Sequence, residues 1–110
     1  MIIWITGRKH SGKTTLAYKL KEQLGNCVVL DGDEIREITG NTEFADSSRI
    51  RNQRIVTKLA KMLVRQGVEN IIIACVSPVK SVRESFQKEL GALEIQMPFG
   101  ELWEGTKYEE

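Results

Sequence analysis

Eight consecutive residues near the start of the chain, residues 7–14, have the types and spacing that bind a phosphate chain. They read G-R-K-H-S-G-K-T and match the pattern G-x-x-x-x-G-K-[ST] in full. The two glycines allow backbone angles that turn successive N–H groups toward a phosphate. ATP with magnesium is the ligand that this chemistry predicts, and we expect it to contact Gly7, Arg8, Lys9, His10, Ser11, Gly12, Lys13, Thr14 and Thr15.

Two residues of this loop are expected to take part in the chemistry directly. Lys13 is predicted to reach the β- and γ-phosphates, and the Thr14 hydroxyl is predicted to ligate Mg²⁺. For His10 two interpretations remain open, a phosphate contact or a solvated loop position. A lone histidine does not predict a metal site of its own.

A second chemical group lies in residues 30–36, which read L-D-G-D-E-I-R and follow an apolar run. Ligands of open parallel sheets bind at the carboxyl ends of the strands, so Asp31 and Asp33 should face the same cleft as the phosphate loop. A carboxylate there can take the proton of an acceptor hydroxyl or hold magnesium. Asp33 is the candidate for both tasks, because the other apolar runs do not end in an aspartate, whereas Asp31 is expected to cap the next helix.

Three arginines and an asparagine form a third group within six positions. Arg49 and Asn52 are three residues apart, so on a helix they share one face. Planar guanidinium groups suit an anionic acceptor, although solvated surface charge is an equally good interpretation of Arg49, Arg51 and Arg54.

Strands that alternate with helices are predicted to position these groups. Short apolar runs bounded by turn residues indicate buried strands, and leucines at helical spacing indicate helices between them. The pattern predicts strands at 1–6, 27–30, 70–76 and 93–97, and helices from 13 to about 24, at 33–38, from about 46 to Gly67, and at 79–90. Asp46, Ser47 or Ser48 is expected to cap the long helix. The fold class is therefore α/β, a three-layer P-loop NTPase fold with a parallel sheet of about four strands and helices on both faces.

Length and composition fit one domain over residues 1–110. The net charge is +1, and 41% of the residues are hydrophobic. Neither the charge nor the composition indicates nucleic acid or a membrane as a partner. We see no secretion signal at the first residues, and Cys27 and Cys75 lie inside apolar runs typical of a reducing compartment. These features predict a cytoplasmic location, with small-molecule nucleotides as partners and a homodimer left open.

The motifs, in this order and spacing, resemble those of the adenylylsulfate kinase family, which phosphorylates the 3′-hydroxyl of adenosine 5′-phosphosulfate. The resemblance extends from about residue 2 to residue 98. Residues 30–36 match the family's L-D-G-D-x-x-R, and residues 49–52 match its R-x-x-N motif, with Phe44 in the place of the phenylalanine before it. Ser77-Pro78 is also similar to the family's sequence at the end of a strand.

By this resemblance, Asp33 would be the catalytic carboxylate, close to magnesium and to the acceptor hydroxyl. Phe44 would pack on the adenine of the acceptor, and the arginines and asparagine would hold its phosphosulfate end. The resemblance thus implies an acceptor site made of Asp33, Arg36, Phe44, Arg49, Asn52, Val76 and Ser77.

The family's mobile lid, with a K-G-L-Y signature, is expected after Pro98, but residues 99–106 read F-G-E-L-W-E-G-T. We expect residues 99–110 to form an irregular tail in place of the lid, within a minimal kinase-like domain. Two alternatives stay open. One is a kinase for another nucleotide or small phosphorylated metabolite; the other is an ATP-binding regulatory module without turnover, which the absent lid favours.

Overall fold

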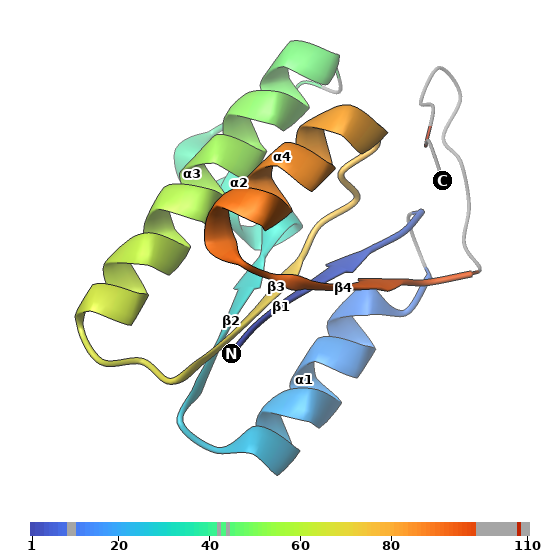
Figure 1. The fold of residues 1–110 in the computed structure, drawn as a ribbon. Coiled ribbons are helices and arrows are strands. Elements are labelled where there is room, and N and C mark those ends of the chain that lie inside the picture. The colour runs from blue at the N-terminus through green and yellow to red at the C-terminus, as the bar shows by residue number, and fades with distance from the viewer. Residues whose placement is uncertain (9–10, 42, 44, 99–107, 109–110) are drawn as a thin grey trace.

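The computed structural model describes residues 1–8, 11–41, 43, 45–98 and 108. Four parallel strands form one sheet, in the order β2-β3-β1-β4. Figure 1 shows helices on both sides of this sheet, so the expected α/β layering is confirmed. The predicted irregular tail lies outside the described residues, except for Tyr108.

The strands match the predicted apolar runs with small differences at their ends. They are β1 (Ile2–Thr6), β2 (Cys27–Asp31), β3 (Asn70–Ala74) and β4 (Leu93–Gln96). β1 is central and pairs with β3 on one side and β4 on the other. β3 ends two residues earlier than expected, because the chain leaves the sheet after Cys75, whose N–H donates to the carbonyl of Ile5 at 3.2 Å.

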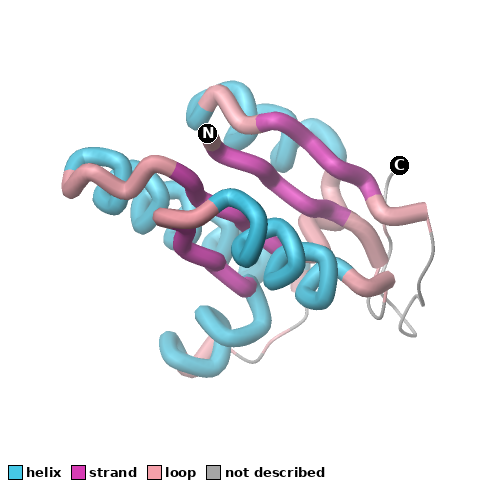
Figure 2. Tube along the Cα trace, turned by 90° about the horizontal axis from the view of Figure 1, so that it is seen from below, coloured by secondary structure: helices cyan, strands magenta, loops and turns pink. Residues whose placement is uncertain are grey.

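The helices are α1 (Lys13–Leu24), α2 (Gly32–Thr39), α3 (Asp46–Arg65) and α4 (Lys80–Leu90). α1 covers one face of the sheet, and the other three helices cover the opposite face (Figures 1 and 2). No helix in the part of the chain described here is both long enough and apolar enough to cross a bilayer.

β1, β2 and β3 supply side chains to both cores, because successive residues of a strand point to opposite faces. Trp4 and Ile73 face the three helices, where they pack with Val56 and Phe86. Ile5 and Ile72 face α1 instead. Burial on both faces explains why β1 and β3 read as continuous apolar runs.

The ends of the long helix correct two expectations. None of Asp46, Ser47 and Ser48 caps α3, because Ala45 is at the cap position and makes no side-chain hydrogen bond. The Ser48 hydroxyl donates to Glu43 at 3.2 Å instead. The helix ends at Arg65, and Gly67 follows with φ +90°, a left-handed angle that glycine adopts easily after a helix.

Candidate active site

A cavity of about 290 Å³ lies where the carboxyl ends of β2 and β3 meet the beginning of α1. Its position is that of ligand sites in open parallel sheets. The cavity brings together five of the nine predicted ATP-binding residues and both aspartates at the end of β2, Asp31 within the strand and Asp33 just after it. It is lined by Ser11, Gly12, Lys13, Thr14, Thr15, Asp31, Asp33, Ala74, Cys75 and Val76.

A glycine is needed at each of the two glycine positions of the phosphate loop, for a different structural reason in each case. Gly12 stands before α1 with φ +89°, so it lets the chain turn into the helix with its N–H groups toward the cavity. Gly7 has φ +148°, and a Cβ there would lie 2.9 Å from the Cβ of Met97. Gly7 therefore allows close packing beside β4. The predicted ligands Lys9 and His10 lie outside the described residues.

Lys13 extends back across the loop. Its Nζ donates to the carbonyl oxygen of Arg8 at 2.8 Å and lies 3.4 Å from the Ser11 hydroxyl. Burial lowers the pKa of Lys13, while the carboxylates of Asp33 and Asp31 oppose that change. A cation held here, beside the N-terminus of α1, gives the cavity wall its affinity for phosphate oxygens.

Asp31 makes two contacts, only one of which was predicted. Its Oδ1 accepts a hydrogen bond from the N–H of Asp33 at 3.0 Å, so Asp31 is the helix cap that the sequence predicts. Its Oδ2 accepts a hydrogen bond from the Thr14 hydroxyl at 3.1 Å. This second contact links β2 to the phosphate loop.

The donor set around that contact fits magnesium. The Thr14 hydroxyl and the carboxylates of Asp31 and Asp33 are hard oxygen ligands on one cavity, and Mg²⁺ usually combines one or two such ligands with water and phosphate oxygens. Within the described residues, no cluster of three acidic, histidine or cysteine side chains forms a complete protein cage for a metal. These oxygens can therefore supply part of a magnesium coordination shell, with water and phosphate oxygens supplying the rest.

A second, small cavity of about 20 Å³ adjoins the first. Six of the seven predicted acceptor residues line it; the seventh, Phe44, lies outside the described residues. Asp33, Cys75 and Val76 line both cavities, so the carboxylate of Asp33 stands at their junction. The complete lining is Gly32, Asp33, Arg36, Arg49, Asn52, Gln53, Cys75, Val76 and Ser77.

Two guanidinium groups give this second cavity a positive wall. Arg36 is held by backbone carbonyls, since its Nε donates to Asn41 at 3.1 Å and its Nη2 donates to Glu43 at 2.6 Å. Burial lowers the pKa of Arg49, and the cation of Arg36 adds to the effect. Arg51 and Arg54, by contrast, are exposed on α3 and line neither cavity, and the guanidinium carbon of Arg54 lies 5.9 Å from the centroid of the Phe86 ring.

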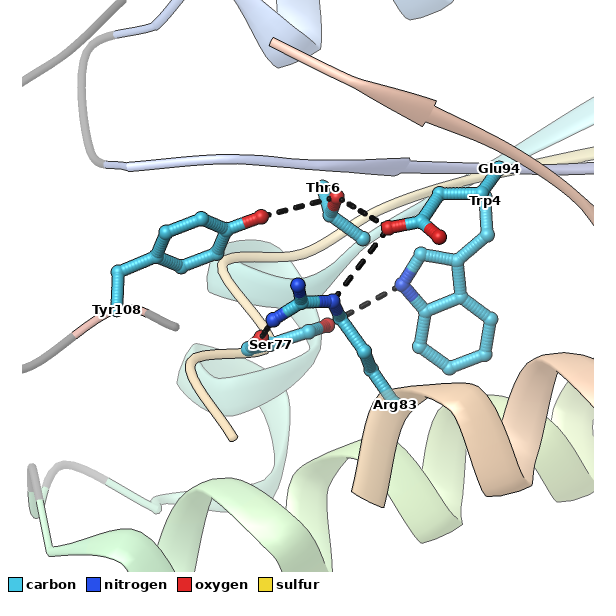
Figure 3. A network of polar contacts seen from close by, with 6 residues as sticks. All are labelled: Trp4, Thr6, Ser77, Arg83, Glu94 and Tyr108. Carbon is cyan, nitrogen blue, oxygen red and sulfur yellow. Dashed lines mark hydrogen bonds and ion pairs between the residues drawn. The ribbon is translucent and has the colours of Figure 1, made fainter. Parts of the chain in front are cut away.

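Ser77 is held at the cavity wall by a buried polar network (Figure 3). Its backbone has φ +49°, which is rare for serine. The indole N–H of Trp4 donates to the Ser77 hydroxyl at 3.2 Å, and Arg83 donates to the Ser77 carbonyl at 3.1 Å. Arg83 also pairs with Glu94 at 3.4 Å, so β1, α4 and β4 together fix this turn.

Gly32 and Cys75 belong to the site but were not predicted to. A Cβ on Gly32 would lie 2.7 Å from the Cys75 sulfur, so the two segments approach too closely for any larger residue. Burial raises the pKa of the Cys75 thiol to about 12, and the carboxylates of Asp31 and Asp33 add to the rise. The thiol therefore stays neutral and acts as a packing group.

Replacing Gly32 with alanine should lower the free energy of unfolding by about 1–3 kcal/mol, because the new methyl group overpacks against Cys75. Chemical denaturation of both proteins measures the difference. The control is the same change in a Cys75→Ala background, where the loss should be much smaller. Equal losses in the two backgrounds would show that the contact is not the cause.

The parallel sheet, the phosphate loop and the two joined cavities define the chain as a P-loop kinase-like protein. The family model for adenylylsulphate kinase matches residues 1–108, and the chain belongs to this family. A probable adenylyl-sulfate kinase from Pyrococcus abyssi is 43% identical over 94 residues, which are 81% of this chain and 53% of that protein. A cytidine diphosphoramidate kinase from Campylobacter jejuni is 38% identical over 93 residues, 81% of this chain and 54% of that protein.

Among solved structures, the Mycobacterium tuberculosis APS kinase CysC in complex with AMPPNP and APS is similar in fold. Its TM-score is 0.67 at 22% identity, and the match covers 86% of this chain and 59% of that one. At this identity the likeness supports the fold alone. The chain spans about half the length of the curated relatives it matches.

Proposed function

We propose that this protein transfers the γ-phosphoryl group of ATP to the 3′-hydroxyl of adenosine 5′-phosphosulfate, with magnesium as the cofactor. The observation that carries the proposal is the position of Asp33 on the wall shared by both cavities. A carboxylate between a triphosphate site and a cationic site lies where a hydroxyl must lose its proton. Membership of the adenylylsulphate kinase family supports the choice of acceptor.

In the proposed reaction, Asp33 takes the proton of the 3′-hydroxyl as that oxygen bonds to the γ-phosphorus. The bond from the γ-phosphorus to its bridging oxygen breaks, and ADP leaves with the electron pair. Lys13 and the N–H groups at the beginning of α1 hold the phosphate oxygens, and Thr14, with Asp31 and Asp33 beside it, holds the metal. Bound magnesium neutralises charge on the β- and γ-phosphates.

The other residues proposed for the ATP site are Gly7, Arg8, Lys9, His10, Ser11, Gly12 and Thr15. Of these, Ser11, Gly12 and Thr15 line the large cavity, and the phosphate contacts of Lys9 and His10 stay predictions. In the proposed acceptor site, the guanidinium groups of Arg36 and Arg49 hold the phosphosulfate end. Asn52, Val76 and Ser77 form the remaining wall beside them. Phe44 stays a prediction for the adenine contact.

A second candidate acceptor is cytidine 5′-diphosphoramidate, on which a relative of similar identity acts by name. It also offers an anionic end to the two arginines, although that end is a phosphoramidate in place of a phosphosulfate. A module that binds ATP without turnover is a weaker alternative, because such a module needs no cationic cavity beside Asp33.

The acceptor is tested by calorimetric titration of adenosine 5′-phosphosulfate into the protein saturated with ADP and magnesium. We expect saturable binding of one acceptor per chain. Cytidine 5′-diphosphoramidate is titrated in parallel. Binding of the phosphoramidate without binding of the phosphosulfate would reject the proposed acceptor and select the second candidate.

Replacing Arg49 with alanine should weaken acceptor binding by roughly 10–100-fold, because a charge-assisted hydrogen bond to the anionic end is lost. ADP affinity should stay within a few-fold. Arg51→Ala is the matched control, since Arg51 is exposed on the same helix and outside the cavity. Equal effects of the two changes on the acceptor would mean that Arg49 acts only through overall charge.

We also propose a cytoplasmic location and a homodimer. The unpaired state of Cys27 and Cys75 supports a reducing compartment. Leu93, which is 60% exposed on the edge strand β4, supports self-association. Light scattering of the purified protein over a range of concentrations tests the dimer.

A further inference from the structure

Gln53 lies on the wall of the small cavity, although the sequence analysis assigned it no role. It is on α3, next to Asn52, and only 2% of its surface is exposed. Its Oε1 is buried and has no hydrogen-bond partner among the described residues. The Oδ1 of Asn52 is in the same state, again within the part of the chain described.

The orientation of Asn52 is fixed by its other amide atom. Its Nδ2 donates to the carbonyl oxygen of Gly32 at 3.2 Å, so Oδ1 is the atom left for another donor. Buried carbonyl oxygens are nearly always hydrogen-bonded, because an unsatisfied one loses its hydration without compensation. Both residues with such an oxygen line the same cavity, so the two unsatisfied acceptors point to a donor group placed there.

The small cavity limits the kind of group that can meet these oxygens. Its volume of about 20 Å³ has room for one group about the size of a water molecule. Oxygens of an anion cannot satisfy the two amide oxygens, because all of them are acceptors. An acceptor that fills the cavity must bring a hydrogen-bond donor as well as the negative charge that suits Arg36 and Arg49.

We propose that Gln53, together with Asn52, determines acceptor specificity by accepting a hydrogen bond from an O–H or N–H group of the acceptor nucleotide. The inference rests on the proposed function in that the small cavity is taken as the acceptor site. Donors of two kinds have the required chemistry. Both candidate acceptors carry ribose hydroxyls and an exocyclic amino group on the base, whereas only the phosphoramidate has an amide N–H at its anionic end.

The test replaces Gln53 with methionine, which keeps a similar volume but removes the amide oxygen, and uses Gln53→Leu as a second variant. Gln87→Met is the matched control. Gln87 is 6% exposed on α4, its Nε2 has no partner among the described residues, and it lines neither cavity of the site. Adenosine 5′-phosphosulfate and cytidine 5′-diphosphoramidate are each titrated into protein saturated with ADP and magnesium. Thermal melting and ADP affinity confirm that each variant is folded.

If the donor is one that both nucleotides carry, a ribose hydroxyl or the amino group of the base, both Gln53 variants should bind both nucleotides about tenfold more weakly than the wild type. If it is the amide N–H, only phosphoramidate binding should fall by that amount. Gln87→Met should bind as the wild type does in either case.

Unchanged affinity for both nucleotides in folded Gln53 variants would overturn the inference and leave Gln53 as a packing residue of α3. If the wild type does not bind the phosphosulfate, the proposed acceptor is rejected but the inference about Gln53 is not. The titrations with the phosphoramidate would then still decide the role of Gln53. Failure of the wild type to bind either nucleotide would overturn both proposals.

Discussion

Replacing Asp33 with asparagine is expected to reduce phosphoryl transfer by about a hundredfold or more, while affinity for ATP with magnesium stays within a few-fold. The carboxylate stands between the two cavities, and an amide of the same shape cannot take the proton of the acceptor hydroxyl. Steady-state rates with saturating ATP and acceptor, combined with a nucleotide titration, separate the two effects.

The matched control is Glu22→Gln, the same loss of a carboxylate at an exposed position of α1, outside both cavities. It should transfer phosphate at the wild-type rate. Turnover of Asp33→Asn close to wild type would demote Asp33 to a structural residue. A loss of ATP affinity as large as the loss of rate would instead make it mainly a metal-binding residue.

Replacing Lys13 with alanine should weaken ATP binding by on the order of a hundredfold and leave the fold intact. ATP binding weakens because the change removes the cation from the wall of the large cavity. The fold is expected to survive because the Lys13 ammonium contacts only one backbone carbonyl and one hydroxyl of the loop in this structure. Binding of a fluorescent ATP analogue with magnesium measures the loss, and circular dichroism checks the fold.

Lys19→Ala is the matched control for this change, because Lys19 is exposed on the same helix and lies outside the cavity. It should bind ATP as the wild type does. Equal affinity in folded Lys13→Ala would mean that the loop binds phosphate through its backbone alone, against the role proposed for the lysine.

Local patterns were sufficient to predict most of the fold. The run of apolar residues in β1 and the change to helical spacing after Lys13 are short-range features, and both elements form where they were expected. The placement of Asp33 beside the phosphate loop followed from a topological rule, since ligands bind at the carboxyl ends of parallel strands. The grouping of Arg49 with Asp33 was implied by the family resemblance alone. The predicted cap of α3 was wrong, because Ala45 is at the cap position and the Ser48 hydroxyl donates to Glu43 instead.

Contacts between distant segments could not be predicted in the same way. Gly32 and Cys75 are 43 positions apart, and only the folded chain shows that the sulfur leaves no room for a side chain. The burial of Gln53 beside the small cavity depends on how α3 is rotated on the sheet, and periodicity does not fix that angle closely enough. A polar residue inside the helix next to Asn52 was the available signal.

The most direct test of the proposed chemistry is to identify the products formed from ATP, magnesium and adenosine 5′-phosphosulfate. We expect the 3′-phosphorylated nucleotide and ADP in equal amounts, and about a hundredfold less of both in the same time when Asp33→Asn replaces the wild type. Formation of ADP and inorganic phosphate without a phosphorylated nucleotide, or no turnover with either candidate acceptor, would contradict phosphoryl transfer between the two cavities.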